Sequence, residues 1–157
     1  MEQEQPKLRF FIDRGLGRNI VPDAIRQKGY EVVIHDDIFS QDTSDAEWLA
    51  EIGKQGLIFL SKDQNIEKNP AEVMAVMRAR VHGFVLFCAS STGKQNANAF
   101  CLALPNIVEI CSRKAPPTLH RVYLDGKLSG FKNYDHLYRD FIKLQKDADY
   151  QSDKNRE

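Results

Sequence analysis

One apolar run that ends abruptly in polar residues limits most strongly what this chain can fold into. Residues 57–60 are four consecutive apolar residues that follow Gly56, and residues 61–65 are all polar. A short, uninterrupted apolar run is typical of a strand that is buried on both faces, as in parallel sheets. In open α/β sheets, the residues that follow such strands lie beside the crevice where ligands bind. We therefore expect Asp63 at a ligand-binding edge of a sheet.

Three further apolar runs alternate with segments of helical periodicity along the chain. Residues 119–124 alternate like a half-exposed strand, and Asp125-Gly126 is a hairpin signal that makes 128–131 the returning arm. The predicted strands cover residues 7–12, 30–34, 57–60, 84–88, 119–124 and 128–131, and the predicted helices lie at 19–27, from 44, at 70–80, 95–112 and 134–146. Alternation of strands and helices indicates a mainly parallel sheet with helices on both faces. The sequence thus predicts one three-layer α/β/α domain with a mainly parallel central sheet, over residues 1–150. Residues 151–157 are predicted to form a disordered tail, because they lack apolar periodicity.

The composition excludes some classes of protein and leaves others open. Lys plus Arg and Asp plus Glu are balanced at 22 each, so the overall charge favours no nucleic-acid partner and such a partner must be argued from local features. No run approaches the roughly 18 apolar residues that a membrane span needs. The N-terminal residues lack the apolar centre of a signal peptide, and the three cysteines form no CxxC pair. We expect a soluble cytoplasmic protein with reduced thiols.

Acidic residues follow three consecutive predicted strands. Asp13, then Asp36 and Asp37, and finally Asp63 would reach the same edge of a parallel sheet, and Asp45 begins the helix that points its first turn at that edge. Clustered carboxylates repel one another unless a cation lies between them. Mg²⁺ and Mn²⁺ prefer such oxygen ligands, and a metal held in this way can activate water for attack on a phosphodiester. The pattern therefore predicts hydrolysis of a nucleic-acid backbone.

Each of these acids also has a purely structural interpretation. Asp13 and Asp63 are suitable helix N-caps, and Asp45 would be favoured by the helix macrodipole. Glu47 completes a predicted capping box with Ser44, in which each side chain accepts a backbone N–H. The joint pattern is more informative than any single acid, because chance rarely places an acid after three strands in succession.

The order of these segments resembles the PIN-like nucleases, in particular the small bacterial branch related to VapC toxins. The resemblance covers roughly residues 7–90. It rests on four segments in the family's order, which are DRGL at 13–16, GYEVVIHDD at 29–37, SDAEWL at 44–49 and FLSKDQNI at 59–66.

This resemblance implies a metal-dependent endoribonuclease that hydrolyses RNA phosphodiester bonds as the toxin of a toxin–antitoxin pair. The catalytic residues that it implies are Asp13, Asp45 and Asp63. The implied ligands of Mg²⁺ or Mn²⁺ are Asp13, Asp37, Asp45, Asp63 and Asn65. The residues expected to contact RNA phosphates are Arg14, Arg18 and Lys62. Members of the family commonly form homodimers and are inhibited by a small antitoxin protein, so both partners are expected here.

The chain departs from the family pattern at three positions. Arg14 and Ala46 replace glutamates of the family, and Asn65 replaces an aspartate. Fewer carboxylates make a weaker metal site, so a PIN-like domain that binds without cleaving is an alternative interpretation.

Two other classes of protein fit part of the pattern. A phosphoacceptor domain resembling response-regulator receivers would use Asp13, Asp63, Ser90 and Lys127, but the acidic pair expected after its first strand is missing. The segment GLGRNI at 15–20 has the GxG of a dinucleotide-binding loop, with Ile20 where the third glycine belongs.

Overall fold

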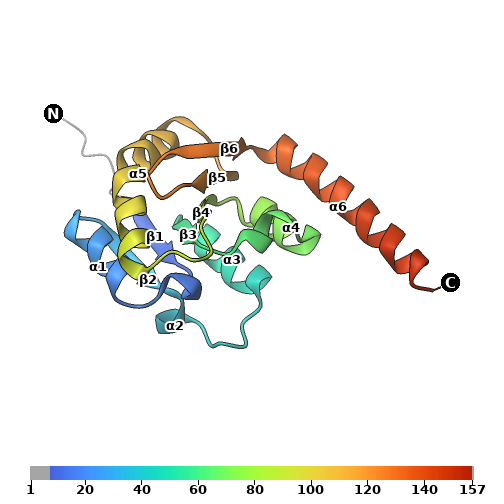
Figure 1. The fold of residues 1–157 in the computed structure, drawn as a ribbon, viewed down its shortest axis with the longest axis horizontal. Coiled ribbons are helices and arrows are strands. Elements are labelled where there is room, and N and C mark those ends of the chain that lie inside the picture. The colour runs from blue at the N-terminus through green and yellow to red at the C-terminus, as the bar shows by residue number, and fades with distance from the viewer. Residues whose placement is uncertain (1–7, 157) are drawn as a thin grey trace.

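The computed structural model describes residues 8–156, which form one six-stranded sheet with helices on both faces (Figure 1). The strand order is β2-β1-β3-β4-β5-β6, in which β1 to β5 are parallel and β6 is antiparallel to β5. The strands are β1 (Arg9–Ile12), β2 (Glu31–Ile34), β3 (Ile58–Ser61), β4 (His82–Leu86), β5 (Thr118–Val122) and β6 (Leu128–Lys132). The predicted fold class, a three-layer α/β/α domain with a mainly parallel sheet, is confirmed.

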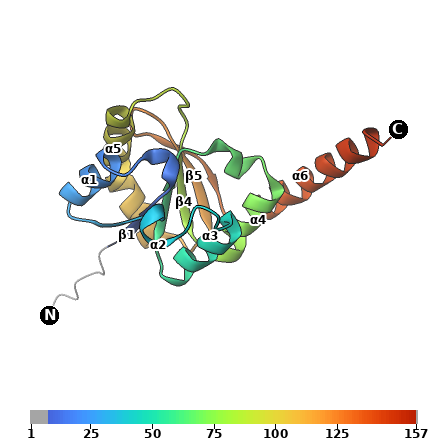
Figure 2. The ribbon, with the colours of Figure 1, turned by 90° about the horizontal axis from the view of Figure 1, so that it is seen from below.

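The helices form the two outer layers. The α-helices are α1 (Ile20–Gln27), α2 (His35–Ile38), α3 (Asp45–Lys54), α4 (Pro70–Ala79), α5 (Gly93–Arg113) and α6 (Tyr134–Lys154), and the 3-10 turns are η1 (Arg14–Leu16) and η2 (Gln64–Glu67). Helices α1 and α5 pack together on one face of the sheet, and α3 and α4 cover the other (Figure 2). Helix α6 packs against α4 and then extends away from the body of the domain (Figure 1).

The core consists of two apolar clusters, one on each face of the sheet. Phe10 of β1 packs with Phe100 of α5 in the first cluster. Its chain neighbour Phe11 points to the opposite face, where its ring stacks on Trp48 of α3 at 5.3 Å and lies 6.3 Å from the ring of Phe59. Successive strand residues face opposite sides, so strands without polar alternation supply both clusters.

The strand order places a crevice between β1 and β3. From β1 the chain passes through α1 to β2 on one side, and then returns to β3 on the other side of β1. Ligands of open α/β sheets bind at such a reversal, outside the carboxyl ends of the strands. The two ends are joined directly, because the Asp13 N–H donates to the Leu60 carbonyl at 3.0 Å. Asp13 and the residues after Ser61 therefore meet at one place.

Strand β4 begins two residues before the predicted start and includes Gly83. Glycine weakens a strand by itself, and Gly83 lies just before the predicted start at Phe84. In the fold, a Cβ atom at position 83 would lie 3.0 Å from Leu119 Cδ1 of the neighbouring strand β5. The close packing of β4 on β5 thus favours the residue that local propensity disfavours.

Three helices differ from the sequence predictions. Helix α2 occupies residues for which no helix was predicted, and α5 is a single helix, although Pro105 is expected from the sequence to kink or divide it. Pro105 is exposed, whereas Leu104 and Ile107 are buried on the sheet side and hold the helix across the proline. Residues 151–154, which we expected in a disordered tail, belong to the last turn of α6.

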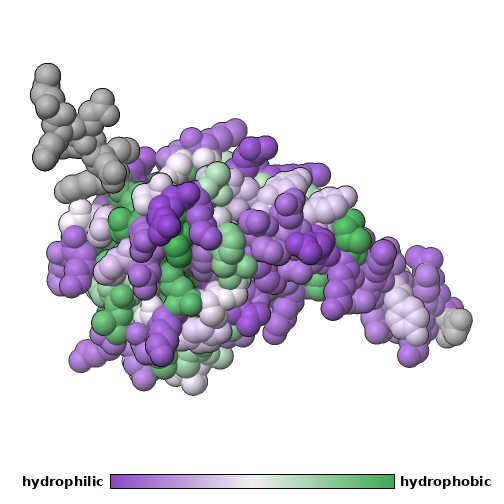
Figure 3. All heavy atoms as spheres, turned by 90° about the horizontal axis from the view of Figure 1, so that it is seen from above, coloured by the Kyte–Doolittle hydropathy of each residue, from purple (hydrophilic) through white to green (hydrophobic). Residues whose placement is uncertain are grey.

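One face of the molecule is shown in Figure 3. Hydrophilic residues predominate on this face, where apolar residues emerge in small groups. None of the helices within residues 8–156 is both long enough and apolar enough to cross a bilayer.

Candidate active site

Asp13 is held in place by two different hydrogen bonds. The residue leaves β1 in an extended conformation and caps η1, because its Oδ1 atom accepts the Arg14 N–H at 2.7 Å. Its other oxygen, Oδ2, accepts the Ser61 hydroxyl at 2.8 Å. The capping role considered from the sequence is present, and it leaves the carboxylate at the carboxyl end of the sheet.

Ser61 links the two acids that follow β1 and β3. Its side chain is fully buried at the end of β3, where the hydroxyl donates to Asp13 and accepts the Asp63 N–H at 2.9 Å. Asp63 then caps η2, with its Oδ1 accepting the Asn65 N–H at 2.9 Å. From the sequence, Ser61 is only the first residue of a polar group, because its bridging role depends on the pairing of β1 with β3.

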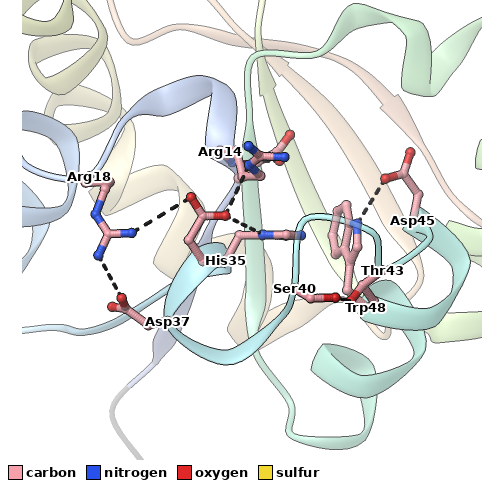
Figure 4. A network of polar contacts seen from close by, with 10 residues as sticks. Arg14, Arg18, His35, Asp37, Ser40, Thr43, Asp45 and Trp48 are labelled. Carbon is pink, nitrogen blue, oxygen red and sulfur yellow. Dashed lines mark hydrogen bonds and ion pairs between the residues drawn. The ribbon is translucent and has the colours of Figure 1, made fainter.

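Asp45 enters the site from the start of α3. Ser44 caps this helix by accepting the Glu47 N–H at 3.2 Å, but the structure shows no return bond from the Glu47 side chain, so only half of the predicted capping box is present. Asp45 Oδ1 accepts the Trp48 indole N–H at 2.9 Å (Figure 4). Trp48 is buried against Phe11, so the aromatic core orients this carboxylate.

A fourth carboxylate, Glu72 of α4, completes the group. A cavity of about 80 Å³ is lined by Asp13, Asp45, Trp48, Leu49, Phe59, Ser61, Asp63, Ile66 and Glu72. One oxygen of Glu72, Oε2, is buried and has no hydrogen-bond partner among the described residues. Four acids from four separate segments of the chain thus surround one small space.

The negative charges around this cavity perturb one another. Burial raises the pKa of Asp13 above its ordinary value, and the charges of Asp63 and Asp45 raise it further, against the opposing effect of the Ser61 and Arg14 hydrogen bonds. Burial also raises the pKa of Glu72, to about 7, with added contributions from a hydrogen bond to Asp45 and from the nearby charges of Asp63 and Asp13. Acids with raised pKa values in a cleft are typical of functional sites.

The donors around the cavity fit a hard divalent cation. All four charged groups offer oxygen atoms, which Mg²⁺ and Mn²⁺ prefer, and the unpaired Oε2 of Glu72 is a free ligand atom. In residues 8–156, no three histidine, cysteine, aspartate or glutamate side chains converge closely enough to hold one ion as they stand. A cation would relieve the repulsion that raises the pKa of Asp13 and Glu72.

Two further residues predicted as metal ligands lie outside this cavity. Asp37 of α2 is half exposed and pairs with Arg18, whose Nη2 lies 2.9 Å from Asp37 Oδ1 (Figure 4). Asn65 is exposed in η2 and donates its backbone N–H to Asp63. The structure brings Asp13, Asp45 and Asp63 together and leaves Asp37 and Asn65 aside.

The three cations predicted to contact RNA phosphates are engaged within the chain. Arg14 Nε lies 3.1 Å from Asp36 Oδ1, and Arg18 Nη1 lies 3.8 Å from the other oxygen of Asp36. Lys62 donates to the Ser91 carbonyl at 3.1 Å. Both arginines remain largely exposed, so these pairs are weak and can exchange for another anion.

Glu72 was not singled out from the sequence, although a weak signal was present. Asn69 and Pro70 mark a helix start, and an acid in the first turn is ordinarily explained by the helix macrodipole. The spacing from Asp63 to Glu72 in the sequence does not predict that the two acids line one cavity, because this depends on how η2 and α4 pack at the end of β3. Tertiary structure was needed to recognise this residue.

Glu72 should make the metal-free protein sensitive to alkaline pH. Its pKa is raised to about 7 in the folded state and is ordinary in the unfolded chain, so stability is lost as the pH rises from about 4.5 through 7. We expect Glu72→Gln to be more stable than wild type at pH 8 by about 1 kcal/mol, after allowing for solvent screening. Urea denaturation in EDTA at pH 5 and pH 8 measures the difference, which should vanish at pH 5. An equal difference at both pH values would contradict the prediction.

The phosphoacceptor interpretation required Lys127 at the same site. Lys127 instead lies in the turn between β5 and β6, where it lines a separate cleft with Arg113 and Lys114. No cation corresponding to it lines the cavity of the four acids.

Comparisons with known proteins agree with the resemblance seen in the sequence. Residues 8–87 match a family model described as a PIN like domain. The Mycobacterium tuberculosis protein named "Putative ribonuclease VapC45" is 27% identical over 117 residues, which are 72% of this chain and 84% of that protein. The search of solved structures gave no significant match. Because the family model covers more than half of the chain, this protein belongs to the PIN-like domain family.

Proposed function

We propose that this protein is an endoribonuclease that hydrolyses RNA phosphodiester bonds with Mg²⁺ or Mn²⁺ held by Asp13, Asp45, Asp63 and Glu72. The observation that carries the proposal is the convergence of these four carboxylates on one cavity, at the point where the strand order reverses. The name of the mycobacterial relative supports the choice of RNA as substrate.

The residues of this chain have separable roles in such a reaction. A divalent ion at this site would activate a water and stabilise the charge that develops on the phosphate. Ser61 links the carboxylate of Asp13 to the backbone of Asp63, so the distance between these two residues depends on the pairing of β1 with β3. Glu72, whose buried Oε2 has no hydrogen-bond partner among the described residues, would offer this oxygen to the ion.

Arg14, Arg18 and Lys62 are the proposed contacts to RNA phosphates, since phosphate contacts supply much of the affinity for a nucleic acid. Asp36 and Asp37 pair with the two arginines in the free protein, and a bound phosphate would replace these carboxylates. We further propose that the protein acts in the cytoplasm as the toxin of a toxin–antitoxin pair. Its proposed partners are a small antitoxin protein and a second copy of the chain, as a homodimer.

The proposal is tested by comparing two acids on the same helix. Asp45 lines the cavity, whereas Glu47 is exposed and lines a different cleft with Thr43 and Glu51. With a mixed single-stranded RNA pool and Mn²⁺, we expect Asp45→Asn to lose cleavage by about 100-fold and Glu47→Gln to retain it. Wild-type cleavage should stop in EDTA. Equal effects of the two substitutions, or wild-type cleavage that persists in EDTA, would overturn the proposal.

A further inference from the structure

Arg121 of β5 forms a bidentate ion pair with Glu67 of η2. The Arg121 Nε atom donates to both carboxylate oxygens, at 3.1 and 3.2 Å, and Nη2 donates to Oε2 at 2.7 Å. The Glu67 side chain is only 5% exposed, so the carboxylate of this pair is buried although the Arg121 side chain is 36% exposed, whereas the acids paired with Arg14 and Arg18 are more exposed. A bidentate arginine–carboxylate pair defines the relative orientation of its partners, which a single contact does not.

The guanidinium is itself fixed on its other side. Arg121 Cζ lies 4.4 Å from the centroid of the Phe87 ring, which follows β4. Arg121 is also paired within the sheet, opposite Val85 of β4 and Ser129 of β6. The sheet therefore fixes the position of Arg121, and Arg121 in turn fixes the position of Glu67.

Glu67 is the last residue of η2, and Asp63 caps the start of the same turn. Between them, Ile66 is buried and lines the cavity of the four acids. The turn has only four residues, so its end cannot move without moving its capping residue. The upstream end is held separately, by the bond from the Asp63 N–H to Ser61.

We propose that Arg121 is a positioning residue, which holds Asp63 in the active site by anchoring η2 through Glu67. Arg121 lies outside residues 8–87, the part of the chain that matches the family model. The expected effect of Arg121 on metal binding and catalysis rests on the proposed function. The anchoring of η2 by Arg121 does not, and it can be measured without metal or RNA.

The test compares the double variant Arg121→Gln/Glu67→Gln with wild type. Removing Arg121 alone would leave the buried Glu67 charge unpaired and could unfold the protein, whereas the double variant leaves neither charge. A matched control is Lys132→Gln/Asp140→Asn, which removes a 2.6 Å ion pair between β6 and α6, outside the cavity. Two quantities are measured in both: amide hydrogen exchange of residues 63–67, and the dissociation constant for Mn²⁺ in the absence of RNA.

We expect exchange at residues 63–67 to accelerate about 10-fold in the double variant and not in the control. The Mn²⁺ dissociation constant should rise by about 10-fold in the double variant alone, as is usual when a group that orients a ligand is removed. Exchange unchanged from wild type, or wild-type Mn²⁺ affinity despite faster exchange, would overturn the positioning role. If wild type itself binds no Mn²⁺ and cleaves no RNA, the proposed function fails, and the exchange measurement still decides whether Arg121 anchors η2.

Discussion

Asp13→Asn should reduce metal-dependent RNA cleavage by about 1000-fold, which corresponds to roughly 4 kcal/mol of lost transition-state stabilisation. Asp13 is the most constrained of the four acids that line the cavity. Its two carboxylate oxygens accept from Ser61 and from the Arg14 N–H, and its backbone N–H donates to the Leu60 carbonyl of β3. Asparagine has the same shape and keeps one acceptor oxygen, so the substitution removes the charge and preserves the position. Single-turnover cleavage at saturating Mn²⁺ measures the loss.

The same substitution should not destabilise the metal-free fold. Burial and the charges of Asp63 and Asp45 raise the pKa of Asp13, so the folded protein stabilises the ionised form less than the unfolded chain does. We therefore expect the thermal midpoint of Asp13→Asn in EDTA to equal or exceed that of wild type, which separates loss of chemistry from loss of fold. Cleavage within 10-fold of wild type would exclude a central role for Asp13.

Acidification should destabilise the protein through His120, by about 3 kcal/mol between pH 6.5 and pH 4. Burial lowers the pKa of His120 to about 4, and neighbouring His82 and Lys114 lower it further. Its ring stacks on Phe84 with centroids 4.8 Å apart, and its buried Nε2 has no hydrogen-bond partner among the described residues. The unfolded chain binds a proton with an ordinary pKa of 6.5, so the stabilisation is complete above that pH and is lost as the pH falls to 4.

The contribution of His120 is isolated by comparison with His120→Phe. Phenylalanine keeps an aromatic ring between Phe84 and Phe131 but removes the titrating group and the unpaired nitrogen. The acids with raised pKa values, Asp13 and Glu72, act in the opposite direction, since they favour the folded state as they become protonated. Subtracting the two urea-denaturation profiles over pH 4–7 removes that effect. Parallel profiles would contradict the assignment.

Features that depend on local pattern could be predicted from the sequence. The strands β1 and β3 are short, mainly apolar runs, and an acid that follows such a run leaves the sheet at its carboxyl end. This is why Asp13 and Asp63 were expected to meet, and why Asp45, fixed at a helix start by Ser44, was expected beside them. The family resemblance depended on the same local segments, and residues 8–87 match the family model.

Contacts between residues distant in the chain were decided only by the tertiary structure. Glu72 enters the cavity because α4 packs beside α3, and Ser61 joins two acids because β3 pairs with β1. Asp37 had the same sequence signature as Asp13 and Asp63, but β2 is an edge strand and α2 turns its acids toward Arg14 and Arg18. Arg121 reaches Glu67 across 54 residues of sequence. Periodicity specifies which face or end of an element a residue occupies, whereas the order of strands and the packing of helices determine which of those ends meet.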